Sequence, residues 1–469
     1  MGGAGATGQT ETCARTYRRR QPERTPLYAA VRENLVTLVA EADTVGRGLP
    51  RYVVRDFSRY LDCGQLANGF ARVRCETCHD ELQVAFSCKG RGVCPSCNAK
   101  RAHGTAAHLV ERVLPHVPYR QWTLSFPFRL RLALARDAGL LSDALTLFLR
   151  AVFALQRRRA RRRGVGEGQT GAVTFVQRFG SALQLTPHFH ALLPDGVFTA
   201  QGAFVQLPPP TQEEVEGLLV RVRPRVLALL AARGVLEADV PDDALEGYRA
   251  HSLRGQLALM QLDVRAPTRQ QPRCAFLEGF SLHANTHLHA SDRMGLERLC
   301  RYGARGPLAL ERFERTPDGR IAYRMKRALA GGRTHLHFTG LELLRKLTAL
   351  VPPPRSNLVR FHGVFAPGAK LRSALAPPLP LEAAAPGTPA VHVPRVEAAR
   401  VGRTPRLDWA GLLRRTFALD VFLCTRCGGR RRVLAYLTNP TVVRAILAHV
   451  GEPTHVAPLA AAQGPPEWE

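Results

Sequence analysis

The stretch that decides the fold lies in the middle of the chain and reads GAVTFVQRFGSALQLTPHFHALL, residues 171–193. Its two halves, residues 171–178 and 184–193, are rich in apolar, β-branched and aromatic side chains and are joined through Phe179-Gly180-Ser181. This pattern predicts a β-hairpin. Helical spacing of apolar residues recurs on either side of it, at residues 140–163, 211–234, 290–303 and 335–350. The sequence therefore predicts an α+β core, in which an antiparallel sheet has helices on its face.

The second half of the hairpin carries two histidines, His188 and His190, with Phe189 between them. Residues two apart on a strand project from the same face, so both imidazoles would share one side while Phe189 turns into the core. Two imidazoles with open coordination positions suit a divalent metal that polarises a phosphoryl oxygen. Histidines at this spacing also occur by chance, so the spacing alone leaves both interpretations open.

A metal that activates a phosphate needs a nucleophile, and no acidic cluster of the two-metal nuclease type lies near these histidines in the sequence. Tyr302 stands at the end of an amphipathic helix, between Arg301 and Arg305. A phenol is a weak acid, and adjacent arginine charge favours its ionised, nucleophilic form. Tyr302 is therefore the candidate nucleophile. The alternative is a boundary tyrosine that only caps the core.

Two CxxC pairs precede this core. Cys75 and Cys78 form the first and Cys94 and Cys97 the second, at the spacing of a closed, four-thiolate structural zinc site. We therefore expect one zinc ion on these four residues. Two further cysteines either replace one of these ligands or simply pack, namely Cys63 and Cys88.

A third CxxC pair, Cys424 and Cys427, lies near the end of the chain. It is only half of a zinc site, which His449, His455 or a second chain would have to complete. The pair alone does not decide whether a metal binds there.

The chain has 66 Lys and Arg against 38 Asp and Glu, a formal net charge of +28. Such a surface attracts a polyanion and releases its counterions, so nucleic acid is the expected partner. A membrane surface competes for basic charge, but the sequence has no uninterrupted run of about 18 apolar residues and no signal segment. We expect a cytoplasmic protein with no membrane partner. The basic residues proposed to contact DNA are Lys89, Arg91, Lys100, Arg157, Arg158, Arg159, Arg301 and Arg305.

Composition divides the chain into six parts. We expect a disordered basic arm (1–25), a helical and four-cysteine zinc-binding domain (26–105), a mixed core with the histidines (106–372), a Pro/Ala-rich linker (373–404), a small CxxC module (405–455) and a disordered tail (456–469).

Several strings together resemble a known family, the insertion sequence 91 transposases, and within it the common-region (ISCR) branch. They are residues 86–97 (FSCKGRGVCPSC), 175–182 (FVQRFGSA), 187–191 (PHFHA), Arg301-Tyr302, residues 360–367 (RFHGVFAP) and the terminal CxxCGG. The resemblance spans residues 28–452.

This resemblance implies a histidine-hydrophobe-histidine endonuclease domain with a ferredoxin-like sheet. It implies that His188 and His190 hold Mg²⁺ or Mn²⁺ and that Tyr302 attacks single-stranded DNA at the hairpin-bearing element ends. The product would be a 5′-phosphotyrosine and a free 3′ hydroxyl, used for rolling-circle transposition at the bacterial nucleoid. Two rivals remain, a replication initiator or relaxase with the same chemistry and an inactive, zinc-dependent DNA-binding relic.

The sequence departs from the founding pattern of that family at one place. A second tyrosine is expected four residues before Tyr302, and Arg298 stands there instead. This departure weakens any scheme with two alternating tyrosines more than it weakens nicking. A third metal ligand is also expected, for which His283 is the first candidate and Gln177 the second.

Overall fold

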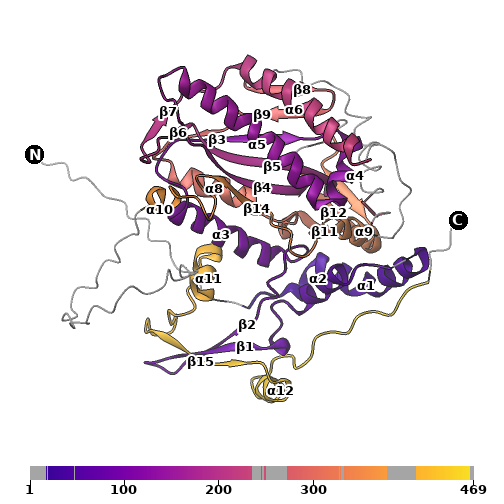
Figure 1. Ribbon diagram of the computed structural model, residues 1–469. Coiled ribbons are helices and arrows are strands. Elements are labelled where there is room, and N and C mark those ends of the chain that lie inside the picture. The colour runs from indigo at the N-terminus through magenta and orange to yellow at the C-terminus, as the bar shows by residue number, and fades with distance from the viewer. Residues whose placement is uncertain are drawn as a thin grey trace, which may run out of the picture.

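The computed structural model describes residues 17, 19–46, 48–234, 245, 248–249, 272–326, 328, 332–377 and 408–464. Its centre is a seven-stranded antiparallel sheet with the order β14-β4-β5-β3-β9-β8, and a short β10 also pairs with β3 (Figure 1). The strands are β3 (Tyr119–Ser125), β4 (Gly171–Phe179), β5 (Leu185–Pro194), β8 (Cys274–Leu277), β9 (Phe280–His283), β10 (His287–Leu288) and β14 (Val359–Gly363). The predicted hairpin is β4 and β5.

Four of these strands and two helices form a ferredoxin-like unit. Along the chain β3 is followed by α5 (Ala138–Arg161), β4, β5, α6 (Gln212–Ala232) and β9, and in space the strands lie in the order β4-β5-β3-β9. This is the split strand-helix-strand-strand-helix-strand topology. A common apolar core joins α5 and α6 to one face of the sheet, with α4 (Phe128–Arg136) beside them. The predicted α+β, ferredoxin-like class is confirmed.

Within the described residues α5 is the one helix long and apolar enough, by length and composition, to cross a membrane. Half of its apolar window is buried. Its Leu141, Phe148 and Val152 pack in the same core as Phe189 of the sheet. The apolar character of α5 is therefore accounted for by packing against the sheet.

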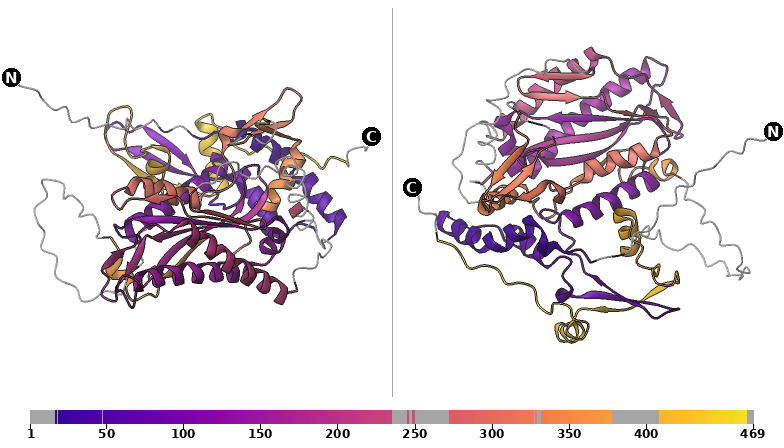
Figure 2. Two further views of the ribbon diagram at one scale, coloured as in Figure 1. Left: turned by 90° about the horizontal axis from the view of Figure 1, so that it is seen from above. Right: turned by 180° about the vertical axis from the view of Figure 1, so that it is seen from behind.

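The opposite face of the sheet is covered by α3 (Pro95–Arg112) and α8 (Arg293–Ala304), which pack against each other and against β4 (Figure 2). Leu109 of α3, Cys300 of α8 and Phe175 of β4 belong to this second core. The sheet is thus a layer between two sets of helices, and α8 ends over its central strands.

A smaller unit packs beside α1 (Pro26–Val45) and α2 (Arg51–Asp62), the two helices that precede Cys63. It comprises β11 (Phe313–Arg315), β12 (Ile321–Arg324), β13 (His335–Phe338) and α9 (Gly340–Leu350). The helix predicted from residue 335 thus starts only at Gly340. The alternating residues of β13 pair with β12, and Thr339 caps α9 through a capping box with Glu342.

A three-stranded sheet, β15-β1-β2, pairs two strands from the N-terminal part of the chain with one from its C-terminal part. Strands β1 (Phe70–Cys75) and β2 (Glu81–Ala85) form a hairpin, and β15 (Arg431–Leu437) adds to the free edge of β1. The flanking helices are α11 (Trp409–Phe417), packed on α3, and α12 (Pro440–His449), packed on η2 (Leu66–Asn68). The segment expected as a separate C-terminal module is thus part of the N-terminal sheet (Figure 1).

The chain ends also differ from expectation where the structure describes them. Residues 19–25 include η1 (Pro22–Arg24), and Arg20 donates a 2.7 Å hydrogen bond to the carbonyl of Cys63. Beyond α12 the chain runs along α1, where Ala460 N donates to the Arg32 carbonyl and Gln463 N to Thr37 Oγ1. Most of the expected linker lies outside the described residues.

The remaining short elements are η3 (Leu310–Arg312), β6 (Gly196–Phe198), β7 (Phe204–Gln206) and α10 (Arg372–Leu375).

Candidate functional site

The two histidines of β5 lie on the sheet face that α3 and α8 cover. Phe189 turns to the other face, where it is fully buried and its ring meets Phe126 edge to face at 5.4 Å. The ring centroids of His188 and His190 are 4.8 Å apart. As strand alternation predicts, the two imidazoles share one face.

The hydrogen bonds of these imidazoles leave one nitrogen of each for another partner. His188 Nδ1 lies 2.6 Å from the Thr186 carbonyl oxygen, so it donates, and Nε2 carries the lone pair. His190 Nδ1 lies 3.1 Å from both Thr123 Oγ1 and the Gln121 amide, while its Nε2 is buried and has no hydrogen-bond partner. An orphaned, buried ring nitrogen is unusual and points to a missing ligand.

Electrostatics keep both rings neutral. Burial, reinforced by neighbouring His188 and Arg305, lowers the pKa of His190 to about 3. Burial also lowers the pKa of His188. A histidine coordinates a metal only as the neutral imidazole, so the pair fits a divalent cation as two nitrogen donors.

Tyr302 comes to this pair from the last turn of α8. Its ring centroid lies 5.7 Å from that of His190, and the residue is 38% exposed. The buried Gln177 of β4 donates to the carbonyl oxygens of Tyr302, at 2.8 Å, and Gly303, at 3.0 Å. A Cβ at Gly303 would lie 2.5 Å from the Phe175 ring, so glycine lets the helix end approach the sheet. The phenol is therefore held over the histidines yet open to a substrate.

Cationic groups surround the phenol. Arg305 Cζ lies 4.8 Å from the centroid of the Tyr302 ring and 5.2 Å from that of Phe179, and Lys326 Nζ lies 5.0 Å from the Tyr302 ring. Arg301 lies near His103 of α3 instead. The arrangement offers a neutral donor pair, an exposed hydroxyl and positive charge, which together suit an anionic phosphate diester.

The two candidate third ligands lie at different places relative to the pair: Gln177 is directly opposite His188 on the neighbouring strand β4, whereas His283 is farther away. His283 faces the same side but stands across β3, where both His190 and His283 pair with Thr123. His190 and His283 are thus two strand spacings apart, which amounts to about 10 Å. His283 Nδ1 instead lies 2.9 Å from Cys274 Sγ. The Gln177 amide nitrogen donates to the Tyr302 and Gly303 carbonyls at the end of α8. Sequence reasoning missed this second role, since nothing in the spacing links residue 177 to residue 302.

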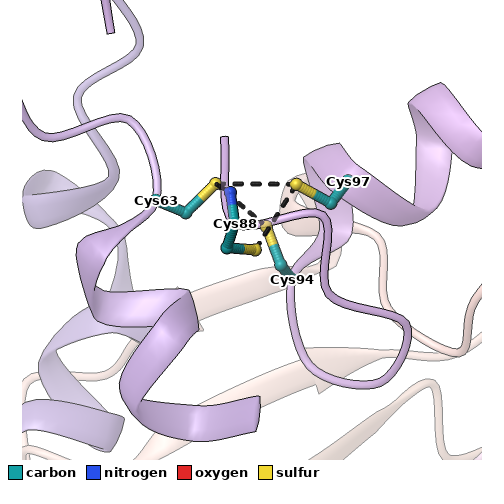
Figure 3. A group of neighbouring side chains, drawn as sticks. All are labelled: Cys63, Cys88, Cys94 and Cys97. Carbon is teal, nitrogen blue, oxygen red and sulfur yellow. Dashed lines mark hydrogen bonds between the residues drawn. The ribbon is translucent and has the colours of Figure 1, made fainter. Parts of the chain in front are cut away.

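The cysteines are grouped differently from the prediction. Cys94 and Cys97 lie with Cys63 and Cys88, not with the first CxxC pair, and all four sulfurs are within 4.8 Å of one another (Figure 3). Three of the sulfur separations are 3.4 to 3.6 Å, close to the roughly 3.8 Å between thiolates around a tetrahedral zinc ion. Cys63 follows α2, and Cys97 lies in the first turn of α3.

The second group unites Cys75 and Cys78 with Cys424 and Cys427. Here Cys75 and Cys427 sulfurs are 3.5 Å apart and those of Cys78 and Cys424 3.6 Å. The predicted single site is thereby corrected to two four-cysteine clusters. The reason is the pairing of β15 with β1, which carries the terminal CxxC pair to the first one.

Two of the residues predicted to contact DNA interact with other parts of the protein instead. Arg91 donates to the carbonyls of Ser356 and Pro353, each at 2.8 Å, and Arg159 pairs with Glu214 at 3.3 Å. The side chains of Lys89 and Arg158 are exposed, and those of Lys100 and Arg157 are partly exposed.

Two family models match the chain, one over its N-terminal cysteine-containing part and one over the central sheet and α8. Residues 36–126, which hold the first four-cysteine cluster and β1 and β2, match the family "Transposase zinc-binding domain" of the insertion sequence 91 group. Residues 171–373, which hold β4, β5 and α8, match the family "Putative transposase" (Y2_Tnp). No curated protein and no solved structure matches the chain.

Together the two matches cover more than half of the chain, and the cysteine clusters supply the thiolates that a structural zinc domain requires. A transposase processes DNA, which agrees with the net charge of +28. The chain belongs to the insertion sequence 91 family of transposases.

Proposed function

We propose that this transposase nicks and rejoins single-stranded DNA at the ends of its element through a covalent 5′-phosphotyrosine, in rolling-circle transposition. The observation that carries the proposal is the meeting of Tyr302 with His190, at 5.7 Å between ring centroids, although they lie on different elements. The exposed phenol, the orphaned His190 Nε2 and the nearby cations are the parts such a reaction needs.

In this scheme Tyr302 Oη attacks the scissile phosphorus as its proton leaves. The bond from phosphorus to the 3′ oxygen breaks, and that oxygen takes up a proton and becomes the free 3′ hydroxyl. A later hydroxyl attacks the tyrosyl phosphate and restores the phenol, so one phosphodiester is exchanged for another without an external energy source.

The remaining residues of the site would position the phenol and the phosphate and neutralise the negative charge of the phosphate. His188 and His190 would hold Mg²⁺ or Mn²⁺, which when bound polarises a phosphoryl oxygen of the substrate. Arg305 and Lys326 place positive charge beside the developing phosphorane. Gln177 fixes the backbone that carries the phenol. With Arg298 in place of a second tyrosine, one phenol serves each strand transfer. We expect the reaction in the bacterial cytoplasm, on single strands and hairpins at the element ends.

The test mixes purified protein and Mn²⁺ with single-stranded oligonucleotides from the element ends and separates the products on a denaturing gel. We expect a protein-DNA adduct that is lost in Tyr302→Phe and in His190→Ala. Tyr52→Phe, at a partly exposed tyrosine of α2, is the matched control and should form the adduct normally. Absence of any adduct while DNA is bound at low salt would favour the binding-only interpretation.

A further inference from the structure

A groove separates the N-terminal sheet from the transposase core. It lies between β1, β2 and β15 on one side and α3 and α11 on the other, with a volume of about 2140 Å³. Figure 1 and the rear view in Figure 2 show α11 between α3 and that sheet. Pockets for small molecules measure about 300 to 1,000 Å³. A space at least twice as large is suited to a polymer.

Several cations line the groove, and three of them lack a partner of opposite charge among the residues that the structure describes. Lys89, Lys100 and Arg112 line it, and none of them forms an ion pair with any residue that the structure describes. Glu111 is the one carboxylate among the described lining residues, and Arg415 already pairs with it at 2.5 Å. Positive charge kept in a groove without counter-charges raises the local concentration of a polyanion.

Aromatic rings lie beside these cations. Phe86 and Tyr436 stack with ring centroids 6.5 Å apart and an angle of 29° between their planes, and Tyr436 is 58% exposed. Trp409 Nε1 donates a 3.1 Å hydrogen bond to Tyr436 Oη, which fixes both side chains. Exposed rings next to a basic track are the features that bind the unstacked bases of a single strand, whereas a duplex keeps its bases inside.

The groove is connected to both the zinc clusters and the nucleophile. Cys63 and Cys97 of the first cluster line it. The second cluster takes Cys424 and Cys427 from the segment that joins α11 to β15, the elements that supply Trp409 and Tyr436. The α3 wall of the groove packs, through another face, against the helix that carries Tyr302. A single strand of DNA held in the groove would therefore have a fixed orientation toward the phenol of Tyr302.

We propose that this groove binds single-stranded DNA that flanks the cleavage site, with phosphates on Lys89, Lys100 and Arg112 and bases on Phe86 and Tyr436. The inference rests on the proposed function and adds the surface that selects and holds its substrate. It also assigns the two cysteine clusters a role, since together they hold the two sides of the groove.

The test measures binding without chemistry. Zinc-loaded Tyr302→Phe protein, with no Mg²⁺ or Mn²⁺, is titrated into fluorescein-labelled oligothymidine at several salt concentrations, and anisotropy is recorded. For Lys100→Ala with Arg112→Ala we expect Kd to rise about tenfold. The slope of log Kd against log salt should fall by about 1.4, which is about 0.7 for each lost phosphate contact to a single strand.

Arg221→Ala with Arg225→Ala on α6 is the matched control, because both residues are exposed and neither lines the groove. It should leave Kd and slope unchanged. Tyr436→Ala should weaken binding of the oligothymidine about tenfold and binding of a blunt duplex much less, since only an unpaired base can stack on the ring. Groove variants that bind like the control, with zinc content and melting temperature intact, would overturn the proposal. That outcome is independent of the adduct assay, which tests the chemistry at Tyr302 and His190.

Discussion

The amide of Gln177 holds the end of α8, because Nε2 donates a 2.8 Å hydrogen bond to the carbonyl oxygen of Tyr302. Gln177 pairs with His188 across the β4 and β5 strands, so one row of the sheet contains both a candidate metal ligand and the group that fixes the phenol. The separation of Tyr302 from the histidines is therefore set by the sheet itself.

Gln177→Met keeps the volume of the side chain and removes its donors. We expect the rate of adduct formation at saturating oligonucleotide to fall at least tenfold, because the end of α8 loses its anchor, while Kd for the oligonucleotide stays within twofold. Leaving two buried carbonyls unpaired costs about 1 to 3 kcal/mol of stability. Rapid-quench kinetics and a melting curve together check this. A purely structural role would change the melting temperature and leave the rate per folded molecule alone.

The buried histidines make stability depend on pH. The folded pKa of His190 is about 3, below its unfolded value of about 6.5. Between these values the unfolded chain binds more protons, so stability is fully present above pH 6.5 and is lost as pH falls toward 3. One such group gives a slope of at most about 1.4 kcal/mol per pH unit. Urea unfolding at several pH values should show a shallower loss for His190→Phe than for wild type, whereas exposed His455→Phe should match wild type.

The sheet and the histidine pair were predictable because their information is local. Alternation along residues 184–193 fixes which side chains share a face, and α5 and α6 follow from helical spacing. The position of His283 was not predictable in this way. Its distance from His190 depends on β3 being inserted between β5 and β9, which only the topology shows.

The two cysteine clusters predict two zinc ions per chain. Cys63→Ser should remove the ion of the first cluster and Cys424→Ser that of the second, so each reduces zinc from about two to about one per chain. Mass spectrometry of the metal in protein freed of loose zinc measures this. Cys300→Ala, at a buried cysteine outside both clusters, should retain both ions. If Cys424→Ser kept the full zinc content, the grouping of the first and last CxxC pairs would be refuted.

The error in the predicted zinc site has a physical cause. CxxC spacing reports which thiolates sit on one turn, and both turns were identified correctly as pairs. Which turns share an ion depends on the register of β15 against β1, where Cys75 pairs with Arg431. Strand β2, which follows the first CxxC pair, returns the chain along β1 and leads to Cys88, the ligand that spacing left over.

A buried ion pair links the ends of three central strands of the seven-stranded sheet, β3, β5 and β9. Arg120 of β3 donates through Nε and Nη2 to the two carboxylate oxygens of Asp195, at 2.8 and 2.6 Å, and through Nη1 to the Ala284 carbonyl at 2.9 Å. Both side chains are less than a tenth exposed. Arg120→Met leaves the carboxylate buried without its main partner, which costs about 3 to 5 kcal/mol. The double variant Arg120→Met with Asp195→Leu removes both charges and should regain most of that loss. Chemical denaturation of the four proteins of this cycle measures the coupling, and strictly additive losses would show that the pair is not a unit.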